Sequence, residues 1–132
     1  MNEEWIKLES DVNIPEDSYV DIILDTKSGL ELNLLSQDDV GYKIIFERAH
    51  SYRRTYEALR LKTINEASEK YDNNIFEPMI LIIENSKYLE WVSKESYDIS
   101  AMIGMKHYVI VDSDMIVEVI SESNPKIIKI GS

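Results

Sequence analysis

The sequence contains no cysteine, only four glycines, and no apolar run longer than residues 79–83. Without cysteine, the chain has no disulfide framework, no thiolate nucleophile and no cysteine-ligated zinc. The glycines are separated from one another along the chain, which excludes the glycine-rich loops that bind phosphate in nucleotide-binding motifs. The apolar run is also far shorter than the ~20 residues that a membrane helix needs.

Basic residues are scarce relative to acidic ones. The chain has 14 Lys and Arg against 25 Asp and Glu, which gives a net charge of -11 and a pI of about 4.6. Such a surface repels phosphate backbones and anionic membranes and attracts basic partners. The N-terminal residues lack the basic and apolar segments of a secretory signal. We therefore expect a cytoplasmic protein that binds neither nucleic acid nor membrane and uses no cofactor.

The chain is long enough for a continuous core. At 132 residues and 44% apolar composition it fits a single globular domain, residues 1–132. Residues 19–25 form a short β-branched run, and apolar and polar side chains alternate along residues 29–35 and again along 42–47. These patterns predict a hairpin followed by a third strand.

The second half continues with strands and one helix. Residues 79–83 predict a strand buried on both faces, and a helix capped by Asn85 or Ser86 follows. Residues 106–112 and 115–121 predict a second hairpin, and the apolar C-terminal tail adds an edge strand or packs on the core. The predicted fold class is α+β, a mostly antiparallel sheet of about five to six strands with one or two helices packed on one face.

Residues 51–67 are compatible with two structures. If the segment is a helix, Tyr52, Tyr56 and Leu59 fall on one side at helical spacing. As a strand, residues 51–57 place Arg53 on one face and Arg54 with the tyrosines on the other. The helical pattern covers more residues, so we predict a helix over 51–67 and keep the strand as the alternative.

Residues with catalytic or metal-binding chemistry are few. His50 and His107 are candidate acids or bases only if a nucleophile or carboxylate lies close, and a structural role is commoner for isolated histidines. The sequence Asp112-Ser113-Asp114 resembles a metal-binding DxD, but its flanking residues do not fit an EF-hand. A hairpin turn with Asx hydrogen bonds explains it. We therefore expect no catalytic residue and no metal site.

The arginines are concentrated in one segment. All four lie within residues 48–60, and residues 43–62 carry six basic side chains against two acidic ones. The interpretation we favour is an internal brace in which the arginines pair with acids such as Glu47 and Glu57. The alternative is an anion-binding or interface segment made of Tyr52, Arg53, Arg54 and Tyr56.

Part of the sequence resembles a known group of proteins. Residues 82–96, IIENSKYLEWVSKES, are followed by KHYVIVDSDMIVEVIS at 106–121 and by a closing Asn-Pro; IIFERAHSYRRTYEALRLKT precedes them at residues 44–63. This pattern resembles small uncharacterised bacterial proteins that often accompany secreted polymorphic toxins as immunity partners. The resemblance implies a strand for the Tyr-Arg pair. It implies no catalytic residues.

Composition and resemblance together predict a non-enzymatic acidic binding protein, an immunity- or antitoxin-like protein that neutralises a basic toxin or nuclease. The candidate partner-binding acids are Asp38, Asp39, Asp112, Asp114, Glu118 and Glu122, with Glu16 and Asp17 near the first pair. One alternative is a small-ligand or regulatory module that binds an anion through Arg53 and Arg54. A small hydrolase using His50 or His107 is the least favoured. The oligomeric state is left open.

Overall fold

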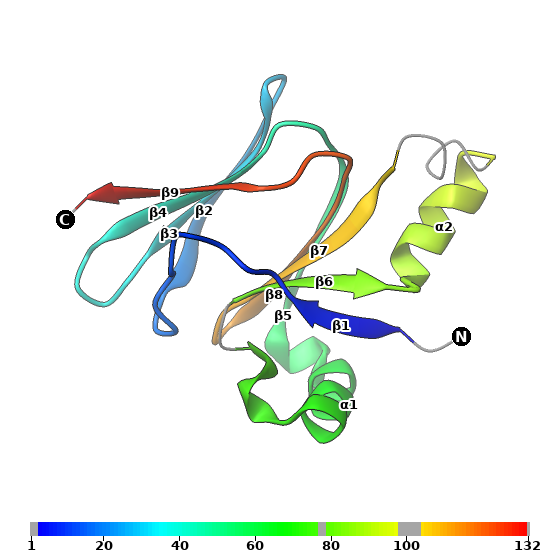
Figure 1. Ribbon diagram of the computed structural model, residues 1–132, viewed down its shortest axis with the longest axis horizontal. Coiled ribbons are helices and arrows are strands. Elements are labelled where there is room, and N and C mark those ends of the chain that lie inside the picture. Colours follow the sequence, from blue (N-terminus) through cyan, green and yellow to red (C-terminus); the bar gives the residue numbers. More distant parts are fainter. Residues whose placement is uncertain (1–2, 77–78, 98–103, 132) are drawn as a thin grey trace.

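The computed structural model describes residues 3–76, 79–97 and 104–131. In this part of the chain, nine strands form two antiparallel sheets that are accompanied by two α-helices (Figure 1). The first sheet has the order β1-β6-β7-β8-β5 and the second β2-β3-β4-β9. The strands are β1 (Glu4–Lys7), β2 (Tyr19–Thr26), β3 (Gly29–Leu35), β4 (Gly41–Phe46), β5 (Ala49–Tyr56), β6 (Ile80–Glu84), β7 (Lys106–Val111), β8 (Met115–Ser121) and β9 (Lys126–Gly131). The helices are α1 (Leu61–Tyr71) and α2 (Lys87–Glu95), with short 3₁₀ turns η1 (Glu57–Leu59) and η2 (Asn73–Phe76).

The α+β class is confirmed, but the strands are more numerous than predicted and are divided between two sheets. The alternation seen in the sequence explains the four-stranded sheet, because Leu30, Leu32 and Leu34 are all buried on one face of β3. Gly29 closes the β2–β3 hairpin at a φ of +128°, where a Cβ atom would lie 2.5 Å from the carbonyl oxygen of Phe46. Glycine is therefore required at this turn.

The main core lies between the two sheets. Side chains of the four-stranded sheet, among them Ile44 and Phe46, pack with Ile110 and Val119 of the five-stranded sheet. The rings of Phe46 and Tyr108 lie 5.3 Å apart across this interface. The sheets therefore form two stacked layers with a shared apolar interior.

The helices cover the other face of the five-stranded sheet. Ile64 and Tyr71 of α1 pack against a second cluster that contains Leu81 and Val109. Ile80 belongs to the main core and Leu81 to this second cluster, so the predicted burial of residues 79–83 on both faces is confirmed for this pair. The C-terminal tail forms β9 at the edge of the four-stranded sheet, one of the two outcomes predicted for it.

The predicted helix over residues 51–67 is wrong in its first part. Residues 49–56 form β5, which pairs with β8, and the helix begins only at Leu61. The supposed apolar stripe is not buried, since Tyr52, Tyr56 and Leu59 are 39%, 55% and 75% exposed. Pairing with β8 decided the structure, as tertiary contacts often override a local pattern. The strand alternative for residues 51–57 is correct over 51–56.

Candidate functional site

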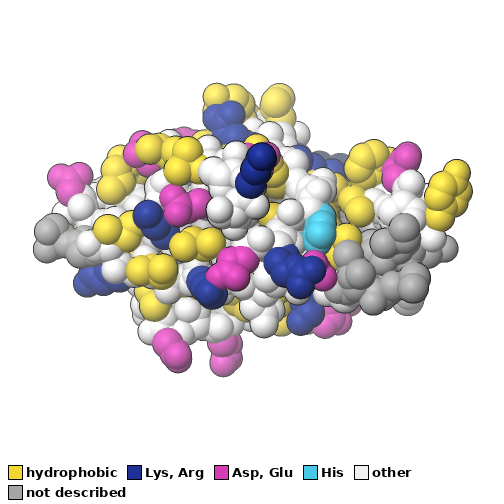
Figure 2. Space-filling model, turned by 90° about the horizontal axis from the view of Figure 1, so that it is seen from above, with side chains coloured by type: hydrophobic (Ala, Val, Ile, Leu, Met, Phe, Trp, Pro, Cys, Tyr) yellow, Lys and Arg dark blue, Asp and Glu magenta, His cyan; other side chains and the backbone are white. Residues whose placement is uncertain are grey.

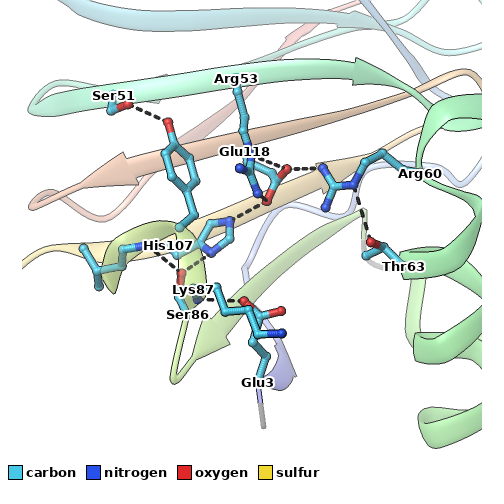
Figure 3. Close-up of polar contacts among 11 residues, drawn as sticks. Glu3, Ser51, Arg53, Arg60, Thr63, Ser86, Lys87, His107 and Glu118 are labelled. Carbon is cyan, nitrogen blue, oxygen red and sulfur yellow. Dashed lines mark hydrogen bonds and ion pairs between the residues drawn. The ribbon is translucent and has the colours of Figure 1, made fainter. Parts of the chain in front are cut away.

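A buried carboxylate lies at the centre of the sheet face between the two helices. Glu118 is 2% exposed and stands opposite Arg53 in the β5–β8 register. Arg53 donates from Nε at 2.8 Å and from Nη2 at 3.0 Å to the two carboxylate oxygens, and Arg60 Nη1 donates to Oε1. Figure 3 shows the two guanidinium groups approaching Glu118 from β5 and from the start of α1. Arg53 and Arg60 thus form an internal brace, but its acid is Glu118 rather than Glu47 or Glu57.

A histidine completes the shell of Glu118. His107 is 2% exposed, and its Nε2 lies 2.9 Å from Glu118 Oε2. Because a carboxylate only accepts hydrogen bonds, Nε2 is the donor. On the other side of the ring, Nδ1 lies 2.6 Å from the hydroxyl of Ser86. The same hydroxyl accepts the Leu89 N–H at 2.9 Å, so Ser86 is the N-cap of α2, one of the two caps that the sequence predicted, Asn85 or Ser86.

The electrostatics of Glu118 follow from these contacts. Burial by itself would raise the pKa of its carboxyl group, but the hydrogen bonds from His107, Arg53 and Arg60 outweigh burial and hold the pKa well below its usual range. The same pairing raises the pKa of Arg53. The Arg53 guanidinium also stacks 4.3 Å from the centre of the Tyr88 ring. Glu118 is therefore an ionised, fully partnered acid.

Ser86, His107 and Glu118 are the residue types of a hydrolase triad, joined by hydrogen bonds. Their surroundings do not favour nucleophilic catalysis. Ser86 is 6% exposed and its hydroxyl caps a helix. The Glu118 carboxylate already forms ion pairs with two arginines. A nucleophile must reach its substrate, and a triad acid must be able to orient its histidine. The geometry is that of an interior polar network.

The remaining arginines have other partners. Arg48 Nη2 lies 2.6 Å from Glu122 Oε1, and His50 Nε2 lies 3.2 Å from the same oxygen. Arg54 points to the opposite face of β5 from Arg53, and its guanidinium lies 4.8 Å from the centre of the Tyr56 ring. The predicted anion-binding pair of Arg53 and Arg54 is therefore divided between two faces of one strand.

The predicted partner-binding acids are not equally accessible. Asp38, Asp39 and Asp114 are exposed. Glu122 is half-buried and holds Arg48, whereas Asp112 and Glu118 are buried. The expectation that the last two belong to an open acidic surface is wrong.

The burial of Asp112 has a simple cause. Its Oδ1 accepts the N–H groups of Asp114 and Met115, each at 2.7 Å, which is the Asx turn that the sequence predicted. Its Oδ2 accepts the Val20 N–H at 2.9 Å and so ties the β7–β8 turn to the start of β2. Asp112 is therefore buried because its carboxylate holds the β7–β8 turn together and binds it to β2.

The exposed acids gather at one end of the molecule. Tyr19 pairs with Leu35, and Leu35 pairs with Gly41, so the turns before β2 and after β3 lie at the same end of the four-stranded sheet. These turns carry Glu16, Asp17, Asp38 and Asp39. The Asp112 turn joins them through its bond to β2.

A cavity of about 510 Å³ opens at this end, next to α1 and η2. Four of its described lining residues are acids and none is Lys or Arg; the acids are Glu16, Glu57, Asp72 and Asp112. Apolar side chains, including Phe76 and Met79, form much of the remaining wall. We call this feature the acidic cavity.

A second hollow, of opposite charge, lies between α1 and the start of α2. It measures about 500 Å³, and five cations and two acids line it: Arg53, Arg60, Lys62, Lys70, Lys87, Glu3 and Glu66. We call it the cationic groove. The face seen in Figure 2, by contrast, shows acidic, basic and hydrophobic side chains interspersed. Charge of one sign is gathered locally and does not cover every face.

Sequence reasoning missed the role of Glu118. One signal was present: it is the only charged residue in MIVEVIS, a strand otherwise apolar or small on both faces. A charge in such a strand is buried and needs partners. The two arginine partners, 65 and 58 residues away, leave no local trace.

No helix in the described part of the chain is long and apolar enough to cross a membrane. Within the same residues, no group of three or more histidine and acid side chains is placed to hold a metal ion.

Comparison with known proteins identified no relative. No family model matches the chain, and neither the curated proteins nor the solved structures contain a significant match.

Proposed function

We propose that this protein is a non-catalytic binding protein that recognises a basic protein through its acidic end. The acidic cavity is the observation that carries the proposal. It combines carboxylates with an apolar wall, in a volume within the range of ordinary binding pockets. A lysine or arginine side chain fits this chemistry, because its aliphatic stem packs on apolar groups while its charge meets the acids.

Charge around the cavity supports the same partner. Asp38 and Asp39 are exposed in the β3–β4 turn at this end of the four-stranded sheet, and the molecule as a whole carries -11. An acidic field of this kind steers a basic protein into contact and accelerates association. Neutralisation of a toxin or nuclease is the form of this function that the sequence resemblance implies.

The test is co-purification of the tagged protein from its native cells, with a charge-neutral variant of the cavity for comparison. The variant combines Glu16→Gln with Glu57→Gln. The control combines Asp25→Asn with Glu95→Gln, which removes the same charge from residues that do not line the cavity. We expect one basic protein in stoichiometric amount with the wild type and the control, and its loss with the cavity variant.

The recovered pair is then assayed for the partner's own activity. Inhibition by the wild-type protein, and not by the cavity variant, would support the neutralising role. A partner without excess positive charge, or one retained equally by both variants, would contradict docking at the acidic end.

A further inference from the structure

The cationic groove adjoins an aromatic hollow. The aromatic hollow measures about 580 Å³ and is lined by Ser51, Tyr52, Arg53, Lys87, Tyr88 and Trp91. Arg53 and Lys87 line both hollows, so the two adjoin along the start of α2, and together we call them the recess. Trp91 is 58% exposed, and its ring lies 6.5 Å from that of Tyr88, so it makes an open aromatic wall beside the cations. We call this aromatic hollow the aromatic shelf.

The groove retains hydrogen-bonding capacity after the internal brace is satisfied. Arg53 uses Nε and Nη2 on Glu118, and no contact within the described part of the chain engages its Nη1. Lys87 is held through its backbone N–H by Glu3 at 2.9 Å, and its ammonium group forms no ion pair among the described residues. Lys62 pairs with Glu66 at 3.9 Å and Lys70 with Glu4 at 3.4 Å. Glu118 neutralises one of the two arginines, which leaves the Lys87 ammonium group and one guanidinium charge to attract an anion.

These groups suit a phosphate better than a bare ring or an uncharged solute. Guanidinium and ammonium donors that converge on one hollow bind oxyanions by charge-assisted hydrogen bonds. The exposed Trp91 ring of the shelf suits a flat ligand, because aromatic stacking stabilises a bound base and tolerates different bases. The recess thus offers a charged half and a stacking half, side by side.

We propose that this recess binds a phosphorylated ring compound of the mononucleotide class, with its phosphates in the cationic groove and its ring on the aromatic shelf. The site is separate from the acidic cavity. It draws on Arg53 and Lys87 rather than on the residues that line the other end. Its ligand is a small molecule, which the distributed negative charge of the chain repels far less than a nucleic-acid backbone.

The test is calorimetric titration of the full chain with three probes: ADP, adenosine and inorganic pyrophosphate. We expect ADP to bind about tenfold more tightly than either fragment, since it occupies both halves of the recess. The two tryptophans provide an independent readout, because Trp5 lines the groove and Trp91 the shelf. In a Trp5→Phe variant, ADP should change the remaining Trp91 emission, and pyrophosphate should leave it largely unaltered.

Three variants keep the proposal falsifiable. Lys87→Gln should weaken ADP binding about tenfold. Lys94→Gln, on the same helix but outside both hollows, should leave it unchanged. Trp91→Leu should weaken ADP binding and leave pyrophosphate binding intact. All three residues are exposed, so thermal unfolding should show folded proteins.

No saturable heat with ADP at millimolar concentration would overturn the proposal. So would equal affinity for ADP and pyrophosphate, or equal weakening by the two lysine variants, which would indicate unspecific charge attraction. Because the acidic cavity variant Glu16→Gln with Glu57→Gln leaves this recess unchanged, it should bind ADP normally even where it loses a protein partner. The two proposals therefore fail independently.

Discussion

Glu118 is the residue on which the polar interior between the helices depends. Its carboxylate is 2% exposed and accepts hydrogen bonds from Arg53, Arg60 and His107. A buried ion pair adds little over an apolar replacement, but removal of one partner leaves buried charge without compensation. Two arginines pair with Glu118, so its removal leaves both guanidinium groups without their carboxylate partner.

We predict that Glu118→Ala lowers the free energy of unfolding by about 3–5 kcal/mol, a large share of an ordinary domain's stability. The measurement is urea denaturation followed by circular dichroism. Glu90→Ala is the matched control, because Glu90 forms an exposed pair with Lys94 at 2.9 Å on the surface of α2. Such a solvent-exposed pair contributes little to stability. Equal losses in the two variants would show that the brace does not stabilise the fold.

The lowered pKa of Glu118 predicts a pH dependence of stability. The folded protein binds this proton more weakly than the unfolded chain, so acid favours unfolding. The contribution is complete above the unfolded pKa of about 4.3 and is lost as pH falls from there toward the folded value. Its slope in that window is at most about 1.4 kcal/mol per pH unit.

The comparison that isolates this effect uses Glu118→Gln, which cannot titrate. Unfolding free energies measured from neutral pH down to pH 3 should run parallel for wild type and variant at first. They should then converge below about pH 4.5, as the wild type loses its extra stability. Curves that stay parallel throughout would mean that Glu118 titrates normally in the folded protein.

At this scale the sequence revealed the residues but not their partners. The concentration of arginines in one segment correctly indicated a brace. Glu47 and Glu57 were expected as its acids because they are close in sequence, whereas the acid used lies on β8, which pairs with β5. Cross-strand register sets such contacts, and no local pattern encodes it.

Among the elements, β5 shows most clearly how a strand separates neighbouring residues. Arg53 faces the helices and Glu118, and Arg54 faces away toward the Tyr56 ring. Two adjacent arginines therefore have different roles because successive side chains of a strand point to opposite faces. A helical reading of the same residues would have placed both near one another.

We predict that Arg53→Gln lowers the free energy of unfolding by about 1–3 kcal/mol, as expected for lost hydrogen bonds to a charged group. Arg54→Gln should change it by no more than about 0.5 kcal/mol, as is usual at exposed positions. Thermal and urea denaturation of the two proteins provide the measurement. If Arg54→Gln were the more destabilising, the assignment of faces along β5 would be incorrect.

The start of α2 is a second element whose role can be tested. Ser86 caps the helix and contacts His107 at 2.6 Å. Ser86→Ala should therefore cost about 1–2 kcal/mol, the upper part of the range for a lost N-cap. Ser28→Ala, in the exposed β2–β3 turn, is the control and should be nearly neutral. A Ser86→Ala protein as stable as the Ser28→Ala control would contradict the capping role of Ser86.

Elements with a clean local pattern were predictable from the sequence. The alternation of Leu30, Leu32 and Leu34 identified β3, and the hairpin of β7 and β8 matched its predicted position closely. The first strand was not predicted, and β5 was predicted only as the alternative to a helix, since each is short or mixed in polarity and is stabilised by a neighbour far along the chain. The division into two sheets followed from the same long-range pairings.

Over the whole molecule, charge is separated between two ends of the helix-covered side. The acidic cavity meets α1 near η2, and the cationic groove lies between α1 and the start of α2. The sequence indicated one basic segment in an acidic chain. It could not show that Lys70 and Lys87, from outside that segment, would join Arg53 and Arg60 in the groove. Folding collected charges that the linear distribution kept apart.

This separation predicts how a basic partner associates. If the acidic end steers the encounter, the association rate constant should fall about tenfold or more when NaCl is raised from about 50 to about 500 mM, because the Debye length shortens. The dissociation rate should change much less, since rim charges act mainly on the encounter. Stopped-flow or surface plasmon resonance measurements with the co-purified partner provide both rate constants.

Asp38 and Asp39 are the residues with which to localise this effect. Both are exposed, and Asp39 has a φ of +61°, a conformation that asparagine tolerates well. Asp38→Asn with Asp39→Asn should therefore keep the fold, slow association and flatten its salt dependence. The control pair Asp25→Asn with Glu95→Gln removes the same charge at a distance from that turn. It should slow association less and change its salt dependence less. Equal effects of the two pairs would mean that net charge, and not the acidic end, guides the partner.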